Sequence, residues 1–431
     1  MTKKRIKLIV SIVLTMILCL CAALPVAADP LTDEPILGTE QTPALASITK
    51  ILEMGEGVPT PEITFSFAFT AVSVDGVTSG ADYDAMPPIT RTVSFLAADP
   101  DNTSGGIKTV RLETGSLFAG VNWPHAGVYI YTVEETKSVT PTLSAQESIL
   151  YSPAKYKVTA WVANGANGLY VAAIASEIVV TDGENGTEVG EKVDARPGGD
   201  PSVSGDYSQM TFTNNYKRVN SAGDPDDYTL AISKAVTTDA LADYDFANRQ
   251  MYFDFSVTVT KSGSNADAAQ KYKAYILDES NAVVTGTANV SSSYIKTDSV
   301  TDEDYIEFTT GDPLTVHLKH GQWLSFVDLE SGATYTVTET GTTDFTPSVS
   351  LVVNGAQPVV TNGTLHTSLT VPATLIGVGD NRADYTNTYK TITPTGISVD
   401  DLPYIVLVAL IALTLVGFAV IRARKNAKHR A

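Results

Sequence analysis

The stretch Gly127–Glu135 constrains the fold of this chain more than any other, because its side chains alternate strictly. Alternation places four residues on one face of a β-strand: Tyr129, Tyr131, Val133 and Glu135. The aromatic and aliphatic members predict that this face is buried. An ionised carboxylate on a buried face needs a partner or a raised pKa, so Glu135 requires a chemical explanation.

A second alternating stretch, Gly332–Glu339, repeats the pattern later in the chain and also ends on a glutamate. Short alternating runs separated by turn residues occur on both sides of a polar linker, and helical periodicity is nearly absent. The sequence therefore predicts an all-β protein with two β-sandwich domains in tandem. Repeats of this length indicate a duplicated domain and not a solenoid.

The strands that the pattern predicts fall into two sets. Those of the first domain are 63–69, 91–96, 127–135, 156–163, 169–180 and 210–214, and those of the second are 229–232, 252–259, 314–318, 324–327, 335–339, 348–353 and 383–387. The Gly-, Asp- and Pro-rich residues 181–209 are expected to form an exposed loop without regular structure.

Both ends of the chain carry targeting signals. Residues 1–28 have a basic start, an apolar run and small residues before a cleavage site between Ala28 and Asp29, which predicts a secretory signal peptide. An uncleaved anchor is the alternative, but the apolar run is short for a membrane span. Residues 402–421 predict a transmembrane helix, and the basic residues after it predict that the tail stays in the cytoplasm.

Cysteine content and charge restrict the classes of function. Both cysteines, Cys19 and Cys21, lie in the signal peptide, so no disulfide can stabilise the exported protein. The formal net charge of −19 argues against nucleic acid or anionic lipid as a partner. Three histidines, His125, His317 and His320, lack metal-ligand spacing, so no metal site is expected.

Three polar residue types recur in the same order among the apolar residues of the two domains. They are Lys50, Glu135 and Asn214 in the first domain, and Lys234, Glu339 and Asn387 in the second. Together these types support an amide bond between the lysine amine and the asparagine carboxamide, with loss of ammonia. Burial lowers the lysine pKa and raises the glutamate pKa, which provides a neutral nucleophile and a proton shuttle without a cofactor. Lysine, glutamate and asparagine are each common on exposed strand edges, so one of them alone predicts nothing. The prediction depends on the same three residue types recurring in the same order in both domains.

The combination of Lys, Phe-x-Phe, Gly-x-Tyr-x-Tyr-x-Val-x-Glu and Phe-Thr-Asn resembles the isopeptide-linked domains of Gram-positive, sortase-assembled backbone pilins, the streptococcal FctA-like family. The resemblance implies Ig-like, CnaB-like domains with two intramolecular bonds. One would join Lys50 to Asn214 with help from Glu135, and the other would join Lys234 to Asn387 with help from Glu339. Glu134 is the rival catalyst in the first domain, but alternation places it on the opposite face.

Residues Thr393-Pro394-Thr395-Gly396, before the apolar run, resemble a shortened sortase sorting signal. The segment lacks the residue that usually stands between Pro394 and Thr395, and a membrane-proximal linker is the alternative. By the resemblance, a sortase would cut between Thr395 and Gly396 and pass the Thr395 carboxyl group to an amine.

Polymerisation requires an acceptor lysine on another copy, which the family places shortly before the last strand of the first domain. Lys192 is the candidate, with Lys155 and Lys217 as alternatives. The resemblance implies a structural pilus shaft subunit that is not an enzyme beyond its own crosslinking. Its partners would be a class C-type pilin sortase, a housekeeping sortase, further copies in a head-to-tail polymer, and minor pilins. A singly wall-anchored adhesin or a minor (basal) pilin of the same fold is the alternative.

The expected organisation follows from these assignments. It comprises a signal peptide (1–28), a flexible lead (29–45), an N-terminal isopeptide domain (46–217), a linker (218–227), a C-terminal isopeptide domain (228–390), a sorting motif (391–396), a transmembrane helix (402–421) and a basic cytoplasmic tail (422–431). The mature protein is expected at the cell surface, covalently attached to the cell wall or pilus.

Overall fold

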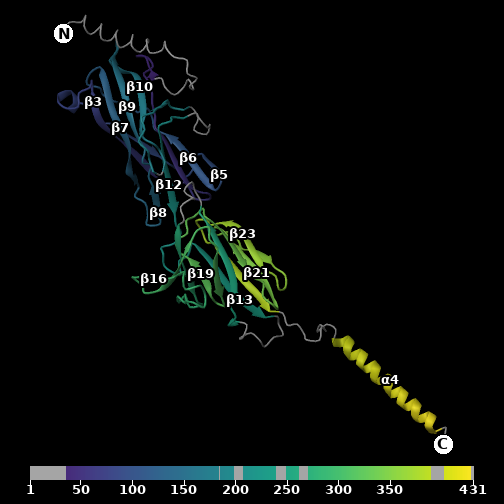
Figure 1. Ribbon diagram of the computed structural model, residues 1–431. Coiled ribbons are helices and arrows are strands. Elements are labelled where there is room, and N and C mark those ends of the chain that lie inside the picture. The colour runs from purple at the N-terminus through teal and green to yellow at the C-terminus, as the bar shows by residue number, and fades with distance from the viewer. Residues whose placement is uncertain are drawn as a thin grey trace, which may run out of the picture.

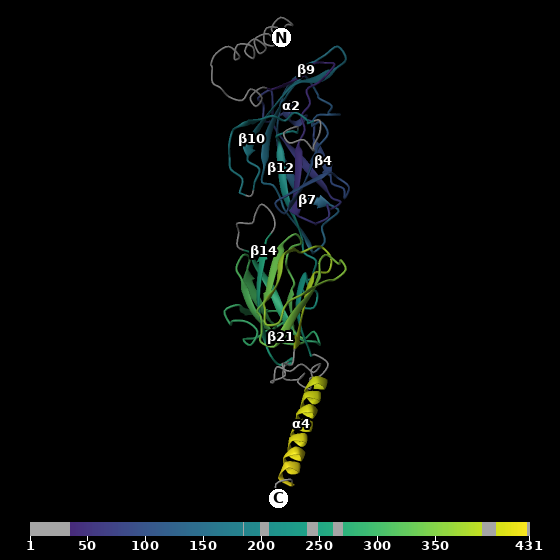
Figure 2. The same ribbon diagram turned by 90° about the vertical axis from the view of Figure 1, so that its right-hand side faces the viewer.

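The computed structural model describes residues 35–183, 185–198, 207–238, 249–261, 270–389 and 402–428. The predicted signal cleavage site at Ala28 and Asp29 and the sorting motif around Pro394, Thr395 and Gly396 lie outside these residues. The prediction of an all-β fold is confirmed: each of two domains consists of two packed sheets, and the domains lie end to end (Figures 1 and 2).

Two sheets enclose the core of the N-terminal domain. One has the order β1 (Ile36–Leu37), β10 (Leu169–Val180), β9 (Lys155–Asn164), β7 (Gly127–Thr140), β3 (Thr64–Val74) and β4 (Thr90–Ser94), with β11 (Lys192–Val193) paired to β10. The other has the order β5 (Asp101–Ser104), β6 (Ile107–Glu113), β2 (Thr49–Gly55), β12 (Thr211–Arg218) and β8 (Glu147–Leu150). A four-residue helix, α2 (Ala81–Asp84), follows β3.

The C-terminal domain repeats this plan with a larger sheet. Eight strands have the order β16 (Ile295–Thr297), β17 (Asp304–Thr309), β15 (Lys271–Leu277), β19 (Trp323–Phe326), β13 (Leu230–Thr238), β24 (Arg382–Tyr389), β21 (Phe345–Val352) and β22 (Val359–Asn362). Four strands face them: β18 (Leu314–Leu318), β14 (Phe253–Thr260), β20 (Thr334–Glu339) and β23 (Leu369–Leu375).

The alternating stretch Gly127–Glu135 lies on β7, in the middle of its sheet. Tyr129, Tyr131 and Val133 are buried in the core, as the alternation predicted, and Glu135 is buried beside them. In both domains the first long strand lies parallel to the last one, β2 beside β12 and β13 beside β24. A parallel pair cannot be joined by a tight turn, so the rest of each domain forms the connection.

Most described residues of the segment 181–209, which was expected to be an exposed loop, are irregular and at least partly exposed, but the prediction is wrong for part of the segment. Residues Lys192–Val193 form β11 against β10, and Val193, Ala195 and Ser208 are buried. Glu113 on β6 accepts hydrogen bonds from the backbone N–H groups of Gly198 (3.0 Å) and Ser208 (2.6 Å). A composition rich in Gly and Asp predicts turns, but it does not prevent the backbone of the segment from forming hydrogen bonds to the neighbouring strands.

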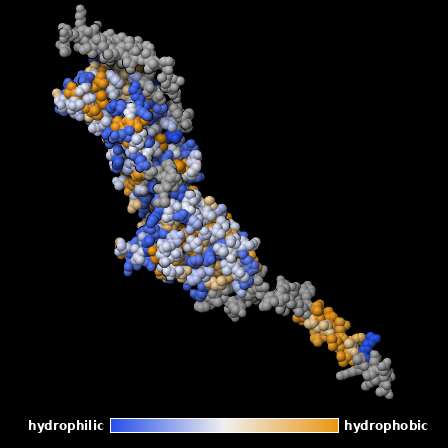
Figure 3. All heavy atoms as spheres, viewed as in Figure 1, coloured by the Kyte–Doolittle hydropathy of each residue, from blue (hydrophilic) through white to orange (hydrophobic). Residues whose placement is uncertain are grey.

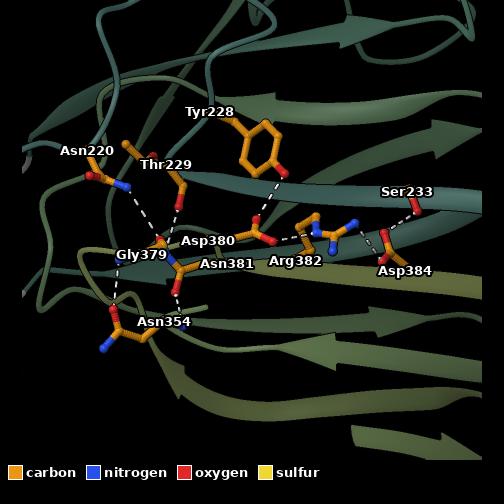
Figure 4. A network of polar contacts seen from close by, with 10 residues as sticks. All are labelled: Asn220, Tyr228, Thr229, Ser233, Asn354, Gly379, Asp380, Asn381, Arg382 and Asp384. Carbon is orange, nitrogen blue, oxygen red and sulfur yellow. Dashed lines mark hydrogen bonds and ion pairs between the residues drawn. The ribbon is translucent and has the colours of Figure 1, made fainter. Parts of the chain in front are cut away.

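Polar contacts join the two domains. Lys217 at the end of β12 forms an ion pair with Glu330 (2.7 Å), and the Ser331 N–H donates to the carbonyl of Arg218 (2.8 Å). Figure 4 shows the neighbouring network, in which the linker residue Asn220 donates to the carbonyl of Gly379 (3.4 Å). The last strand of the N-terminal domain is thus held directly against the C-terminal domain.

Asn381 is the centre of the network in Figure 4 and is almost completely buried. Its amide nitrogen donates to the carbonyls of Thr229, Gly377 and Gly379, and its oxygen accepts the N–H groups of Asn354 and Gly377. One side chain therefore satisfies the backbone groups of three segments that begin or end strands.

In the view of Figure 3 polar residues cover most of the two domains, with scattered apolar residues between them, and exposed apolar residues gather on α4 (Leu402–Lys428). Among the residues that the structure describes, no helix meets the combined length and apolarity of a membrane span.

Candidate functional site

The pairing of β2 with β12 brings the first lysine and asparagine together. Lys50 lies opposite Phe212, and Leu52 lies opposite Asn214 two positions further along. Because side chains two apart share a face, Lys50 and Asn214 both point into the core from the same sheet. Glu135 reaches them from β7 in the facing sheet, where it is paired with Phe67.

The three side chains are in direct contact. Lys50 Nζ lies 2.8 Å from Glu135 Oε1, and Asn214 Nδ2 donates to the same oxygen at 3.0 Å. Lys50 Nζ also donates to the Phe212 carbonyl at 3.0 Å and lies 4.6 Å from the centre of the Phe65 ring. The Lys50 and Glu135 side chains are both 0% exposed, so water does not separate the reacting groups.

The C-terminal domain repeats this geometry. Lys234 lies opposite Tyr385 on β24, two residues before Asn387, and Glu339 on β20 is paired with Phe255. Glu339 Oε1 lies 2.6 Å from Lys234 Nζ and accepts Asn387 Nδ2 at 2.7 Å. The second triad therefore occupies the same register positions as the first, in an equally buried core.

Burial shifts both ionisable partners toward their neutral forms. Desolvation lowers the pKa of Lys50 and of Lys234 to about 8, although the adjacent carboxylates act in the opposite direction. Desolvation also raises the pKa of Glu135 and of Glu339, again against the attraction of the lysines. A proton shared by such a pair can move from amine to carboxylate at low cost, which leaves a nucleophilic amine.

The arrangement has the parts of an amide exchange reaction. One carboxylate oxygen touches both the attacking nitrogen and the nitrogen that would leave, so it can take a proton from the first and give it to the second. The aromatic rings exclude water that would compete as a nucleophile. Within the described ranges, no group of three His, Cys, Asp or Glu side chains is placed to hold a metal ion.

Glu134, the rival of Glu135, lies on the opposite face of β7. Its side chain is 56% exposed and forms an ion pair with Lys155. It has no contact with the triad, as the alternation predicted.

Two residues near the first triad were not identified from the sequence. The Ser152 N–H donates to Asn214 Oδ1 at 2.7 Å, and the Ser152 hydroxyl donates to Asp182 at 2.6 Å. Asp182 belongs to the segment expected to be an exposed loop. No local pattern marks either residue, because both act through contacts between distant segments.

The three candidate acceptor lysines have different surroundings. Lys192 lies on β11 and is exposed. Lys155 pairs with Glu134, and Lys217 is held in the interdomain ion pair with Glu330. The structure thus keeps Lys192 on an accessible strand, while Lys217 is engaged between the domains.

The buried lysines predict a pH dependence of stability in a variant that keeps both amines free, Asn214→Ala/Asn387→Ala. Between pH 8 and the ordinary lysine value of 10.5, the unfolded chain binds protons that the folded chain does not. The free energy of unfolding should therefore rise by about 2 kcal/mol per lysine between pH 8 and 9.5. Urea unfolding at several pH values measures it.

Replacing Lys50 and Lys234 by Met in the same background is the control, because it removes the titrating groups. A free energy of unfolding that is flat or falls over this range in the lysine-containing variant would contradict the assignment.

Two different family profiles match the chain, one over each domain. Residues 46–217 match the profile of a family described as a Spy0128-like isopeptide containing domain. Residues 228–389 match a family described as a domain of unknown function. Among curated proteins, none matches the sequence.

Three solved structures are similar to the chain at low identity. The major pilin from Streptococcus pyogenes is 16% identical, with 81% of this chain and 99% of that chain covered and a TM-score of 0.29. The T3.2 major pilin of the same species is 18% identical, with 80% and 98% covered and a TM-score of 0.28. A Mobiluncus mulieris adhesin described as containing disulfide, isopeptide and ester bond cross-links is 11% identical, with 80% and 100% covered and a TM-score of 0.20.

Proposed function

We propose that this chain, whose residues 46–217 match the FctA-like isopeptide domain family, is the structural shaft subunit of a sortase-assembled pilus, with an autocatalytic Lys–Asn bond in each domain. The observation that carries the proposal is the repeated triad. In both domains a single carboxylate oxygen lies within 3.0 Å of the lysine and asparagine nitrogens, and the lysine and glutamate side chains are at most 1% exposed.

The reaction in each domain balances without a cofactor. The neutral lysine nitrogen attacks the asparagine Cγ after passing one proton to the glutamate, and a C–N bond forms. The glutamate then gives that proton to asparagine Nδ2, the bond between Cγ and Nδ2 breaks, and ammonia leaves. The lysine nitrogen still carries one proton more than an amide nitrogen, and it passes this proton to the glutamate, which ends the reaction protonated. Proximity in the folded core supplies much of the rate, because the two reactants are already in contact.

The mechanical consequence supports a shaft function. A covalent bond between the first long strand and the last one transmits a pulling force directly between these strands. The force then does not have to be borne by the hydrogen bonds between strands. The last strand of the N-terminal domain is in turn tied to the C-terminal domain through Lys217 and Glu330. A protein without cysteines in its mature part gains in this way the resistance that disulfides give other exported proteins.

Attachment and assembly depend on the ends of the chain. In the proposed pathway the signal peptide directs export, the apolar segment 402–421 holds the precursor in the membrane, and a pilin sortase joins Thr395 to Lys192 of the next copy. A housekeeping sortase then fixes the polymer to the cell wall. A singly anchored adhesin or minor pilin is the second candidate, favoured only if the chain does not polymerise.

The mass of the intact recombinant protein, residues 29–395, tests the crosslinking chemistry. Two bonds would lower the mass by two ammonias, and Asn214→Ala or Glu135→Ala would restore one of them. Glu134→Ala is the matched control, because this neighbouring carboxylate faces solvent, and it should leave both bonds intact. An unmodified mass for the folded wild-type protein would refute the proposal.

A further inference from the structure

The two triads differ at the oxygen of the reacting asparagine. Asn214 Oδ1 accepts the Ser152 N–H at 2.7 Å, in a buried position. Asn387 Oδ1 is also buried, but among the described residues it has no hydrogen-bond partner. The first carboxamide is therefore held at both of its polar atoms, by Ser152 and by Glu135, while the second is held only through its nitrogen.

This difference matters for the rate of the reaction. When the amine attacks Cγ, the carbonyl π electrons move to Oδ1, which becomes an oxyanion in the tetrahedral intermediate. A fixed N–H aimed at that oxygen stabilises the developing charge, and removal of one such donor slows comparable reactions about 100- to 1000-fold. The Ser152 N–H is in position before the reaction begins, so no reorganisation is needed.

Asp182 holds Ser152 in this position. Asp182 Oδ1 accepts the Ser152 hydroxyl at 2.6 Å and the Thr213 N–H at 3.0 Å, while Oδ2 accepts the Thr213 hydroxyl at 2.6 Å. Thr213 directly precedes Asn214 on β12. One carboxylate therefore ties the oxyanion donor to the strand that carries the reacting carboxamide.

We infer that the Ser152 N–H is an oxyanion donor for the first crosslink and that Asp182 is its positioning residue, so that the N-terminal bond forms faster than the C-terminal bond. The inference rests on the proposed function. It assigns an order to the two reactions: the N-terminal domain, which is exported first, also forms its crosslink first.

A purely electrostatic role for Asp182 makes the opposite prediction. Its negative charge favours the protonated form of Lys50 and raises the pKa of that amine, which opposes the attack. If charge were its main effect, removing Asp182 would speed the first crosslink. If positioning is its main effect, removal slows the crosslink, so the direction of the change separates the two roles.

The test follows both reactions in the same molecule. The chain 29–395 is made by cell-free synthesis and quenched in acid at intervals, and intact mass with peptide mapping reports each lost ammonia. In the wild type we expect the Lys50–Asn214 bond to form about 100-fold faster than the Lys234–Asn387 bond. Asp182→Ala should slow the first bond at least tenfold and leave the second unchanged, and Asp182→Asn, which keeps an acceptor oxygen, should slow it less.

Ser152→Ala is the second variant, because it keeps the N–H and removes only the hydroxyl anchor, and it should also slow the first bond alone. Asp194→Ala is the matched control from the same segment, since Asp194 contacts Arg196 and not the triad. Equal rates for the two wild-type bonds, or a first bond that Asp182→Ala leaves unchanged or accelerates, would overturn this inference and leave the crosslinks themselves in place. If the folded wild type loses no ammonia, the proposed function fails as well.

Discussion

Asn214→Ala is expected to lower the melting temperature of the N-terminal domain by about 10–20 °C. The bond between Lys50 and Asn214 would close almost the whole domain into one covalent loop. Such a loop removes conformational entropy from the unfolded chain worth about 5 kcal/mol in the chain-entropy treatment of crosslinks. In domains of this size each kcal/mol shifts the melting temperature by about 2–4 °C.

Asn214 is the better residue to replace, because the Asn214→Ala variant still contains both Lys50 and Glu135. These two side chains can then form their ion pair (2.8 Å), and neither is left as an unpaired buried charge. Glu135→Ala would leave a buried lysine unpaired, which alone costs several kcal/mol and would confuse the comparison. Calorimetry of the intact mature chain reports both domains, so the C-terminal transition serves as an internal reference.

Asn215→Ala is the matched control for this experiment. Asn215 is next to Asn214 on β12, and its side chain points to the opposite face. It should leave the melting temperature within about 2 °C of the wild type, as most surface substitutions do. Identical melting temperatures for Asn214→Ala and the wild type would mean that no stabilising crosslink joins these strands.

Lys192→Arg is expected to abolish the ladder of detergent-resistant polymers on cells that express the pilin sortase. Arginine keeps the charge at this exposed position on β11, but its guanidinium group stays protonated and is a poor nucleophile toward an acyl-enzyme. Only the capacity to accept the Thr395 carboxyl group is removed. Immunoblots of cell-wall extracts, boiled in detergent, measure the result.

Lys157→Arg is the matched control. Lys157 lies in the same row as Lys192 across β9, β10 and β11, because Glu177 is the register partner of both. This variant should polymerise normally. A ladder that survives Lys192→Arg would move the acceptor to Lys155 or Lys217, and wild-type protein that stays monomeric on the wall would favour the singly anchored adhesin.

The local pattern was enough to predict the inner faces of the main strands. Alternation placed Glu135 and Glu339 on buried faces and Glu134 on the exposed face of the same strand, because a β-strand has a side-chain period of two wherever it lies. The order of lysine, glutamate and asparagine along the chain suggested that the three side chains meet. It did not say which residues of the first and last strands lie opposite each other. The structure supplies that register, with each lysine opposite the residue two positions before its asparagine.

Contacts between distant segments could not be predicted in this way. The segment 181–209 has the composition of a free loop, yet it pairs with β10, is bound by Glu113 and places Asp182 beside Ser152. These contacts are made by backbone hydrogen bonds and by single carboxylates. Neither kind of contact produces a periodic pattern of residue types in the sequence.

The sequence by itself determined the all-β architecture and which carboxylates face the two cores, since both depend on a side-chain period that is local. Only the tertiary structure decided that a backbone N–H meets the oxygen of Asn214 while that of Asn387 has no partner among the described residues. The physical reason is that such a contact depends on where two segments cross in space, which no spacing along the chain encodes.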